Sequence, residues 1–146
     1  MASLLTLLPD AQRAGVYRTD FAAEEIIAAA KTVDLHVVKL DLGRVRAKLA
    51  LLDALAKALR FPDHFGKNWD ALNDCLTDLS WLDGKGWLLI LINCKSFAQD
   101  HEGDFNRTVE VMRAAADYWR EQKKPFWVLI EGEADWEIDL PKIVSD

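Results

Sequence analysis

Apolar residues in this chain of 146 residues fall into two patterns, short continuous runs and longer amphipathic stretches. Residues 87–92 and 126–130 are continuous apolar runs, which are typical of strands covered on both faces of a sheet. Residues 35–42 are rich in Val and Leu and end before Gly43, so they predict a third strand. Residues 15–19 are a candidate for a fourth strand at the edge of that sheet.

Amphipathic segments separate these runs and predict helices. They cover residues 21–31 after a cap at Thr19 or Asp20, residues 45–59, a short helix opened by capping-box spacing at residues 96–99, and residues 104 to about 122 after a cap at Asp104. In the second helix the apolar side consists of Val45, Leu49, Leu52, Ala56 and Leu59. Strands joined through helices need crossover connections. The pattern therefore predicts a compact α/β domain with a small parallel sheet, in which residues 87–92 and 126–130 are parallel neighbours of residues 35–42.

The whole chain, residues 1–146, is expected to form one domain, because it can bury a sizeable core and contains no linker or repeat. Residues 1–32 are interpreted as an appended βα element, since about thirty residues cannot bury enough surface alone. Residues 132–146 form an acidic tail. Two outcomes are open for this tail: its apolar residues pack it onto the domain, or it frays. Those residues are Trp136, Ile138 and Leu140.

The stretch of residues 64–81 predicts a loop, a helix cap and a helix. Gly66 allows a positive φ in the loop, and Asn68 is a good N-cap because its side-chain oxygen can accept from a free amide of the first turn. Beyond the cap, apolar residues recur at helical spacing. They are Trp69, Leu72, Leu76 and Leu79, with Cys75 at the margin.

The opposite side of this predicted helix is acidic, and it carries Asp70, Asp74, Thr77 and Asp78. Asp70 and Asp74 are one turn apart, so their charges repel. A helix selected only for stability would carry Glu–Lys pairs here instead. Two interpretations therefore stay open, a solvated surface and a face kept acidic for a cationic partner.

Composition narrows the class of partner. The chain has 51% hydrophobic and 29% charged residues, a net charge of −6 and a pI of about 5.0. This charge argues against direct binding to nucleic acid, which needs basic patches, and suits a basic protein partner. No apolar run is long enough to cross a membrane, and the Leu-rich residues 1–8 lack the basic region of a signal peptide. We therefore expect a cytoplasmic protein with no membrane partner.

Candidates for catalysis are few. Cys75 and Cys94 are too few for a disulfide framework, and both are interpreted as buried thiols. A nucleophile–base pair of Cys75 with His64 is disfavoured because Cys75 falls on the buried side of its helix. Asp70 and Asp74 lack the apolar pocket that would raise one pKa for acid–base work. We read them as charges and predict no catalytic residue.

A metal site is also disfavoured. The acidic cluster near residue 100 resembles a ligand set, but it lacks the i,i+4 or C-x-x-C spacing of known sites. It is better interpreted as a solvated loop that runs into a helix cap. Its members are Asp100, His101, Glu102 and Asp104. Phosphate-binding, dinucleotide-binding and nucleophile-elbow motifs are absent from the sequence, so no cofactor and no metal are predicted.

The run F-G-K-N-W-D-A-L-N-D-C-L-T at residues 65–77 resembles the signature of the barstar family, intracellular inhibitors of the ribonuclease barnase. The order of elements resembles that family over residues 35–131. The positions that match the family pattern are Gly66, Asn68, Asp70, Ala71, Leu72 and Asp74, continued by Cys75, Leu76 and Thr77.

The resemblance implies an inhibitor, an antitoxin or immunity protein, whose acidic helix residues stand in for RNA phosphates in the basic active site of a secreted or toxin ribonuclease. Asp74 would be the central anion and Asp70 its neighbour. Gly66 would allow close approach of the partner. The full set of implied partner-binding residues is His64, Phe65, Gly66, Asn68, Asp70, Asn73, Asp74, Thr77 and Asp78.

The chain departs from the family pattern at three positions of this stretch. His64 stands where the family has an aromatic residue, Lys67 where it has an acid and Asn73 where it has a Trp. An acid of the family's last long helix falls nearest to Ala114, with Asp117 three residues further on. Two alternatives therefore stay open, a non-inhibitory interaction module for another basic protein or toxin, and an unrecognised small enzyme.

Overall fold

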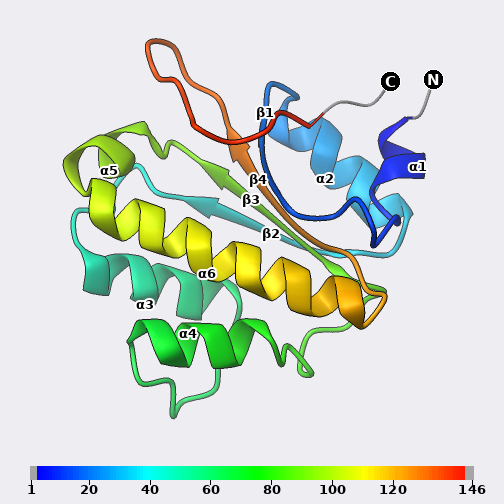
Figure 1. Cartoon of the computed structure of the whole chain (residues 1–146), viewed down its shortest axis with the longest axis horizontal. Helices are drawn as coiled ribbons and strands as arrows, with labels where there is room; N and C mark the ends of the chain where they lie inside the picture. The colour runs from blue at the N-terminus through cyan, green and yellow to red at the C-terminus, as the bar shows by residue number, and fades with distance from the viewer. Residues whose placement is uncertain (1–2, 144–146) are drawn as a thin grey trace.

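The computed structural model describes residues 3–143 and shows a mixed α/β fold (Figure 1). Four parallel strands form one sheet in the order β1-β4-β3-β2. The strands are β1 (Val16–Thr19), β2 (His36–Asp41), β3 (Trp87–Ile92) and β4 (Phe126–Glu131). The helices are α1 (Leu4–Leu7), α2 (Ala23–Thr32), α3 (Lys48–Ala58), α4 (Trp69–Leu76), α5 (Lys95–Asp100) and α6 (Glu102–Glu121).

The predicted parallel sheet is confirmed, with one correction to its order. β3 pairs with β2 on one side and with β4 on the other, so β4 is not a direct neighbour of β2. The candidate strand at residues 15–19 is present as β1, and it pairs with β4 at the edge of the sheet. Apolar runs alone could not give this order, because β3 and β4 are equally suited to a central position.

The handedness of crossovers explains why helices cover both faces. From β2 to β3 to β4 the chain steps across the sheet in one direction, whereas the connection from β1 to β2 crosses it in the other. Right-handed connections in opposite directions must pass over opposite faces. Accordingly, α3, α4, α5 and α6 cover one face, and α1 and α2 cover the other (Figure 1).

Side chains of the central strands alternate between two hydrophobic cores. In β3, Leu89 and Leu91 belong to the core beneath α3, α4 and α6, while Leu88 and Ile90 belong to the core beneath α1 and α2. All four are buried. Burial on both faces is the reason why this strand reads as a continuous apolar run.

The predicted helix at residues 45–59 begins later, at Lys48, and one of its predicted core residues is wrong. Leu49 is 61% exposed, whereas Leu51, Leu52 and Leu55 are buried. The buried stripe follows positions 51, 52 and 55, and Leu49 lies on the other side of the helix from Leu51. Val45 is still buried, although it precedes the helix.

The three side-chain caps predicted for other helices are also wrong. The N-cap positions of α2, α5 and α6 are Ala22, Cys94 and His101, and none of these makes a side-chain cap hydrogen bond. Thr19 accepts instead from the Phe21 amide at 3.0 Å, which forms a turn before the helix. Asp104 lies inside the first turn of α6, where its charge suits the helix dipole.

Residues 132–143, here called the tail, pack against the domain along their described length. Leu140 is buried in the core beneath α6, with Trp136 and Ile138 half-buried against it. The backbone of Lys142 then forms an isolated parallel β-bridge with Arg18 of β1. Ile143 is buried in the opposite core. Residues 144–146 of the predicted acidic tail lie outside the described residues. Within residues 3–143, none of the helices has the length and apolar content needed to cross a bilayer.

Candidate functional site

The acidic helix α4 begins at the predicted cap. Asn68 Oδ1 accepts from the Ala71 amide at 2.8 Å, so the N-cap prediction is confirmed. Asn68 Nδ2 also donates to the Gly66 carbonyl at 3.3 Å, which ties the preceding loop to the helix. Asp70 lies in the first turn, where the helix dipole favours its charge.

The positive φ in this loop belongs to Lys67, not to Gly66 as predicted. Lys67 has a φ of 50°, a conformation that costs a non-glycine residue roughly 1–2 kcal/mol. At Gly66 the constraint is space instead, since a Cβ there would lie 3.2 Å from Asn68 Nδ2. The sequence could not show which residue takes the left-handed conformation, because Gly66 and Lys67 are adjacent.

One side of α4 packs into the core. Leu72 and Leu76 have no exposed surface, and Trp69 is half-buried beneath the Lys48 ammonium at 5.2 Å from the ring centre. At the far end, Trp119 Nε1 of α6 donates to the Leu76 carbonyl at 2.7 Å. A buried indole N–H needs an acceptor, and here the end of α4 supplies it. The helix is therefore fixed at both ends and along one side.

The helix is shorter than its sequence pattern predicted. It ends at Leu76, with Thr77 as its C-cap, so Asp78 lies beyond it. The Asp78 carboxylate accepts from the Ser80 amide at 3.3 Å, and this local turn competes with helix continuation. Leu79 is buried as predicted, but it lies beyond the helix and has a left-handed backbone conformation with a φ of 51°.

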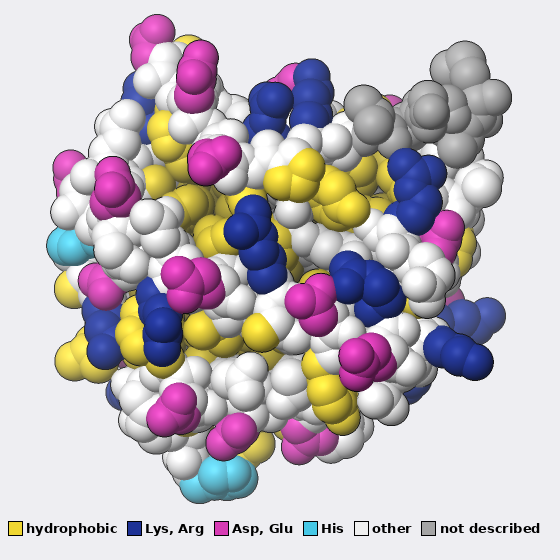
Figure 2. All heavy atoms as spheres, in the orientation of Figure 1, with side chains coloured by type: hydrophobic (Ala, Val, Ile, Leu, Met, Phe, Trp, Pro, Cys, Tyr) yellow, Lys and Arg dark blue, Asp and Glu magenta, His cyan; other side chains and the backbone are white. Residues whose placement is uncertain are grey.

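The opposite side of α4 faces solvent. Asp70 and Asp74 are exposed, while Asn73 and Thr77 are half-buried. Thr77 Oγ1 donates to the Asn73 carbonyl at 2.8 Å and so adds a hydrogen bond at the C-terminal end of the helix. Acidic side chains gather along the lower edge of the molecule in Figure 2, where α4 and the loop before it lie in Figure 1.

The loop before α4 has an aromatic base. The Phe65 ring is half-buried and packs against Phe61, with 4.9 Å between ring centres. Trp81 packs against the same Phe61 and donates from Nε1 to the Leu59 carbonyl at 2.8 Å. His64 is exposed at the loop surface. The aromatic contacts hold the loop against the helical layer and leave His64 and Gly66 on its outside.

Lys67 pairs with α3 and not with the acidic side of α4. Its ammonium lies 3.0 Å from Asp53 Oδ1, and the pair is half-exposed. The hydrogen bond from Lys67, and then its charge, lower the pKa of Asp53 from the ordinary 3.8. Sequence reasoning did not identify Asp53, because the contact joins two elements whose relative placement it could not give. Asp53 therefore offsets the positive charge that Lys67 would bring to this face.

The cysteines differ in burial. Cys94 is buried as predicted, but Cys75 is only half-buried, and both are free thiols. Burial, and then the charges of Asp74 and Asp78, raise the pKa of Cys75. Burial likewise raises the pKa of Cys94. Both thiols are therefore held in the protonated form, which is the poorer nucleophile.

The remaining candidates belong to α5, α6 and the residue between them, not to α4. Among residues 3–143, no group of three or more His, Cys, Asp or Glu side chains is arranged to hold a metal ion. His101 stacks on Phe97 instead, with 5.1 Å between ring centres. Asp117 of α6 is exposed and accepts from Arg120 at 2.6 Å, while Ala114 is exposed and carries no charge.

Comparison with known proteins agrees with the resemblance noted in the sequence. The model of the family described as Barstar (barnase inhibitor) matches residues 35–131, which is the range over which the order of elements resembled it. This range includes β2, β3, β4 and α3 to α6. No curated protein matches the chain. Because the matched range covers most of its length, the chain belongs to the barstar (barnase inhibitor) family.

Proposed function

We propose that this protein inhibits a barnase-like ribonuclease by inserting the exposed side of α4 into its basic active site. The observation that carries the proposal is the presentation of Asp70 and Asp74. Both carboxylates are exposed and lie one turn apart on a helix whose other side packs into the core through Leu72 and Leu76. The two ends of this helix are fixed by Asn68 and Trp119. Carboxylates held in this way lose little conformational entropy when they bind.

The proposed mechanism is mimicry of RNA phosphates. Ribonuclease sites that bind phosphates do so with cationic side chains, and a carboxylate can form charge-assisted hydrogen bonds with the same groups. Asp74 takes the central position and Asp70 the neighbouring one. Complementary charge on the two proteins also raises the association rate. The proposal therefore assigns no catalytic step to this chain.

The other predicted residues surround these two carboxylates. His64 and Gly66 face outward from the loop, and Asn68, Asn73 and Thr77 border the helix. In the proposal they form the side contacts, with Phe65 fixing the loop beneath them. Asp78 lies past the end of the helix, so it contacts the partner only at the rim.

A second candidate is binding to a different basic protein. His64, Lys67 and Asn73 replace the residue types of the family pattern at the proposed face. These replacements change the shape and charge of the rim and leave both carboxylates in place. They therefore favour a change of partner over a loss of binding. On this alternative the same face of α4 captures a basic toxin other than barnase.

The proposal is tested by titrating the RNase activity of barnase with the purified protein. We expect stoichiometric inhibition that weakens strongly for Asp74→Ala and is unchanged for Glu25→Ala. Glu25 is a matched control because it is an exposed acid on α2, at the opposite face of the sheet. If barnase keeps full activity while another basic ribonuclease or toxin is bound through Asp74, the second candidate holds. If Glu25→Ala and Asp74→Ala behave alike, the face is wrongly assigned.

A further inference from the structure

The loop that leads into α4 contains a residue that its own backbone does not hold. Lys67 lies between Gly66 and the N-cap Asn68 and has a φ of 50°. A left-handed backbone is unfavourable for a residue that carries a Cβ, and it persists only where the surroundings enforce it. Within residues 3–143, the amide and the carbonyl of Lys67 form no hydrogen bond. Contacts of side chains therefore keep this conformation in place.

Those contacts come from α3. The Lys67 ammonium lies 3.0 Å from Asp53 Oδ1, and the Lys48 ammonium lies 5.2 Å from the centre of the Trp69 ring. Positions 67 and 69 flank the cap, so one helix contacts the chain on both sides of Asn68. Figure 1 shows α3 beside α4. The start of the acidic helix is therefore held by side chains from a different element.

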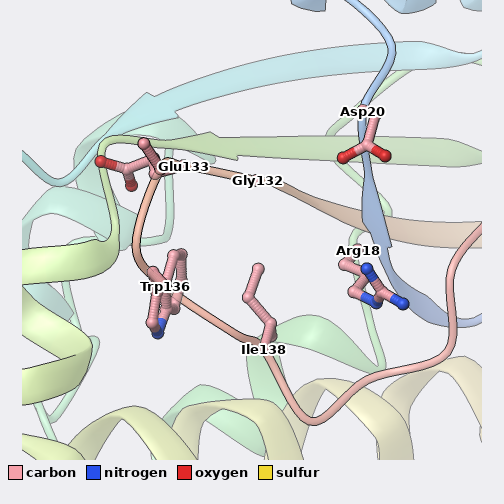
Figure 3. Close-up of a pocket in the computed structure, with 7 residues that line it drawn as sticks. Arg18, Asp20, Gly132, Glu133, Trp136 and Ile138 are labelled. Carbon is pink, nitrogen blue, oxygen red and sulfur yellow. The ribbon is translucent and has the colours of Figure 1, made fainter.

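A second lysine–aspartate pair, at the other end of the molecule, offers a comparison. Figure 3 shows Asp20 at the edge of a pocket of about 250 Å³, which lies where β1 and β4 end. Asp20 pairs with Lys142 of the tail, and this pair is about as exposed as the pair on α3. Here, however, backbone hydrogen bonds to Arg18 hold the tail directly before and after Lys142, at 2.9 and 3.0 Å. This stretch of the tail therefore does not depend on its ion pair.

We propose that Asp53 is a positioning residue for the partner-binding face, because its ion pair keeps Lys67 in the left-handed conformation. The inference rests on the proposed function and adds to it a residue that acts through the loop. By holding Lys67, Asp53 sets how the loop enters the capped first turn, where Asp70 lies. A loop that is held in this way loses less conformational entropy when a partner binds.

The device belongs to this chain and not to the family pattern, which has an acid at position 67. Such an acid would be repelled by Asp53. The lysine at this position is therefore explained by a contact within the protein, and the positive charge is turned toward α3 instead of the partner.

Hydrogen exchange at the Ala71 amide tests the positioning in the free protein. This amide donates to Asn68 Oδ1, so it exchanges when the cap opens. We expect Asp53→Asn to accelerate its exchange about two- to fivefold, the range open to an exposed ion pair. The Thr77 amide at the far end of α4 donates to the Asn73 carbonyl and should keep its wild-type rate. Unchanged exchange at Ala71 would contradict the proposal.

Asp20→Asn is the matched control, because it removes the same charge from the lysine pair at the pocket of Figure 3. Exchange at Ala71 should keep its wild-type rate in this variant. Thermal melts establish that both variants are folded at the temperature of the measurement. Equal acceleration in the two variants would mean that any lost carboxylate loosens the cap, and would overturn the role of Asp53.

A charge swap separates the ion pair from the residues that form it. Asp53→Lys alone brings two lysines together, and Lys67→Asp alone brings two aspartates together, so each should accelerate exchange at Ala71. The double variant restores the pair with its charges reversed, and aspartate tolerates a left-handed backbone. Its exchange rate should return to within about twofold of the wild type. A double variant that shows the combined effect of both single changes would contradict the proposal.

The dissociation rate of the complex with barnase tests the link to function. Asp53→Asn should raise this rate about two- to fivefold, while the association rate also reflects the uncovered charge of Lys67 and does not isolate the positioning. If the wild-type protein does not bind barnase, the proposed inhibition fails, and exchange at Ala71 still decides whether Asp53 positions the loop. If barnase binds and dissociates at the same rate from both proteins although exchange is faster, the positioning role is overturned.

Discussion

The α4 face and the β1–tail region lie at opposite ends of the molecule (Figure 1) and depend on different kinds of contact. The cap, the loop and the carboxylates of α4 come from one stretch of about fourteen residues, in which Asn68 caps its own helix. The β1–tail region joins residues more than a hundred positions apart, as in the hydrogen bond from Arg18 to Leu140. Local sequence therefore specifies the first surface, whereas only the folded chain creates the second.

Removing the tail should have the largest effect on stability. A chain that ends at Gly132 loses the buried side chains Leu140 and Ile143, each worth about 1.5–3 kcal/mol. It also loses the bonds that cover the open edge of β1, where the Arg18 amide donates to the Pro141 carbonyl at 2.9 Å. We expect a loss of about 3–6 kcal/mol of unfolding free energy, measured by urea denaturation.

The same truncation sharpens the comparison between the two regions. Any inhibition of barnase by the α4 face should persist below the new melting temperature, because α4 makes its fixing contacts with α6 and its own loop. A truncated chain that melts like the full one would mean that the tail is not part of the fold. A truncated chain that is folded but has lost inhibition would mean that the two ends are coupled.

Asp74→Ala should have the largest effect on binding. Removing this carboxylate leaves the partner's cations without their anion, and we expect a loss of about 2–5 kcal/mol, measured by titration against the ribonuclease. Reference values for such pairs come from barnase and barstar themselves, so this range is carried over from the family. Thermal stability should not fall, because an exposed acid one turn from Asp70 contributes repulsion.

Asp78→Ala provides the graded comparison on the same surface. Asp78 lies past the end of the helix, so its alanine variant should lose about 1 kcal/mol or less of binding free energy. Added salt should slow association with the wild type, since exposed charges are screened over about 10 Å at 0.1 M. Equal small losses at Asp74 and Asp78 would reduce the acidic side of α4 to a solvated surface.

The parts of the α4 site that sequence predicted correctly are those that neighbouring residues determine. Asn68 caps the helix because its oxygen reaches an amide three residues away, and the burial of Leu72 and Leu76 follows from helical spacing. The errors at Gly66 and Asp78 share one cause, which neighbouring residues do not determine. Competing local conformations of similar energy, a left-handed Lys67 and a side-chain turn at Asp78, are decided by tertiary packing.

At the level of the fold, strand positions and parallel pairing were predictable, but neighbours were not. Apolar runs identify β3 and β4 as buried strands without saying which of them lies beside β2. The contacts of Trp119 with Leu76 and of Lys67 with Asp53 join separate elements, so no spacing rule reports them. The pocket between β1 and β4 was not predicted either, because it exists only when the tail returns to the sheet.

Trp119→Phe tests a long-range contact that supports the local site. This change removes the N–H that bonds the Leu76 carbonyl and leaves that buried acceptor without its partner. We expect a loss of about 1–3 kcal/mol of unfolding free energy in urea titrations. Affinity for the ribonuclease should fall by less than with Asp74→Ala, since the carboxylates remain. Unchanged stability would mean that the end of α4 is fixed by apolar packing alone.

The smallest expected effect is the acid sensitivity of two exposed ion pairs, one in each region. Hydrogen bonding to Lys142, and then its charge, lower the pKa of Asp20 below 3.8, and Lys67 does the same for Asp53. A carboxyl whose pKa is lower in the folded state stabilises the fold above its unfolded pKa. That contribution is lost as the pH falls below about 3.8.

Lys142→Ala and Lys67→Ala should therefore each flatten the fall in melting temperature between pH 6 and pH 3, by a small amount because water screens both pairs. The two variants separate the regions by a second readout. Lys142→Ala changes the tail and should leave ribonuclease binding unchanged. Lys67→Ala releases Asp53 beside α4, makes that surface more acidic and should speed association at low salt. A steeper fall with pH in either variant would contradict the assigned pairs, and faster association with Lys142→Ala would place the tail within reach of the bound partner.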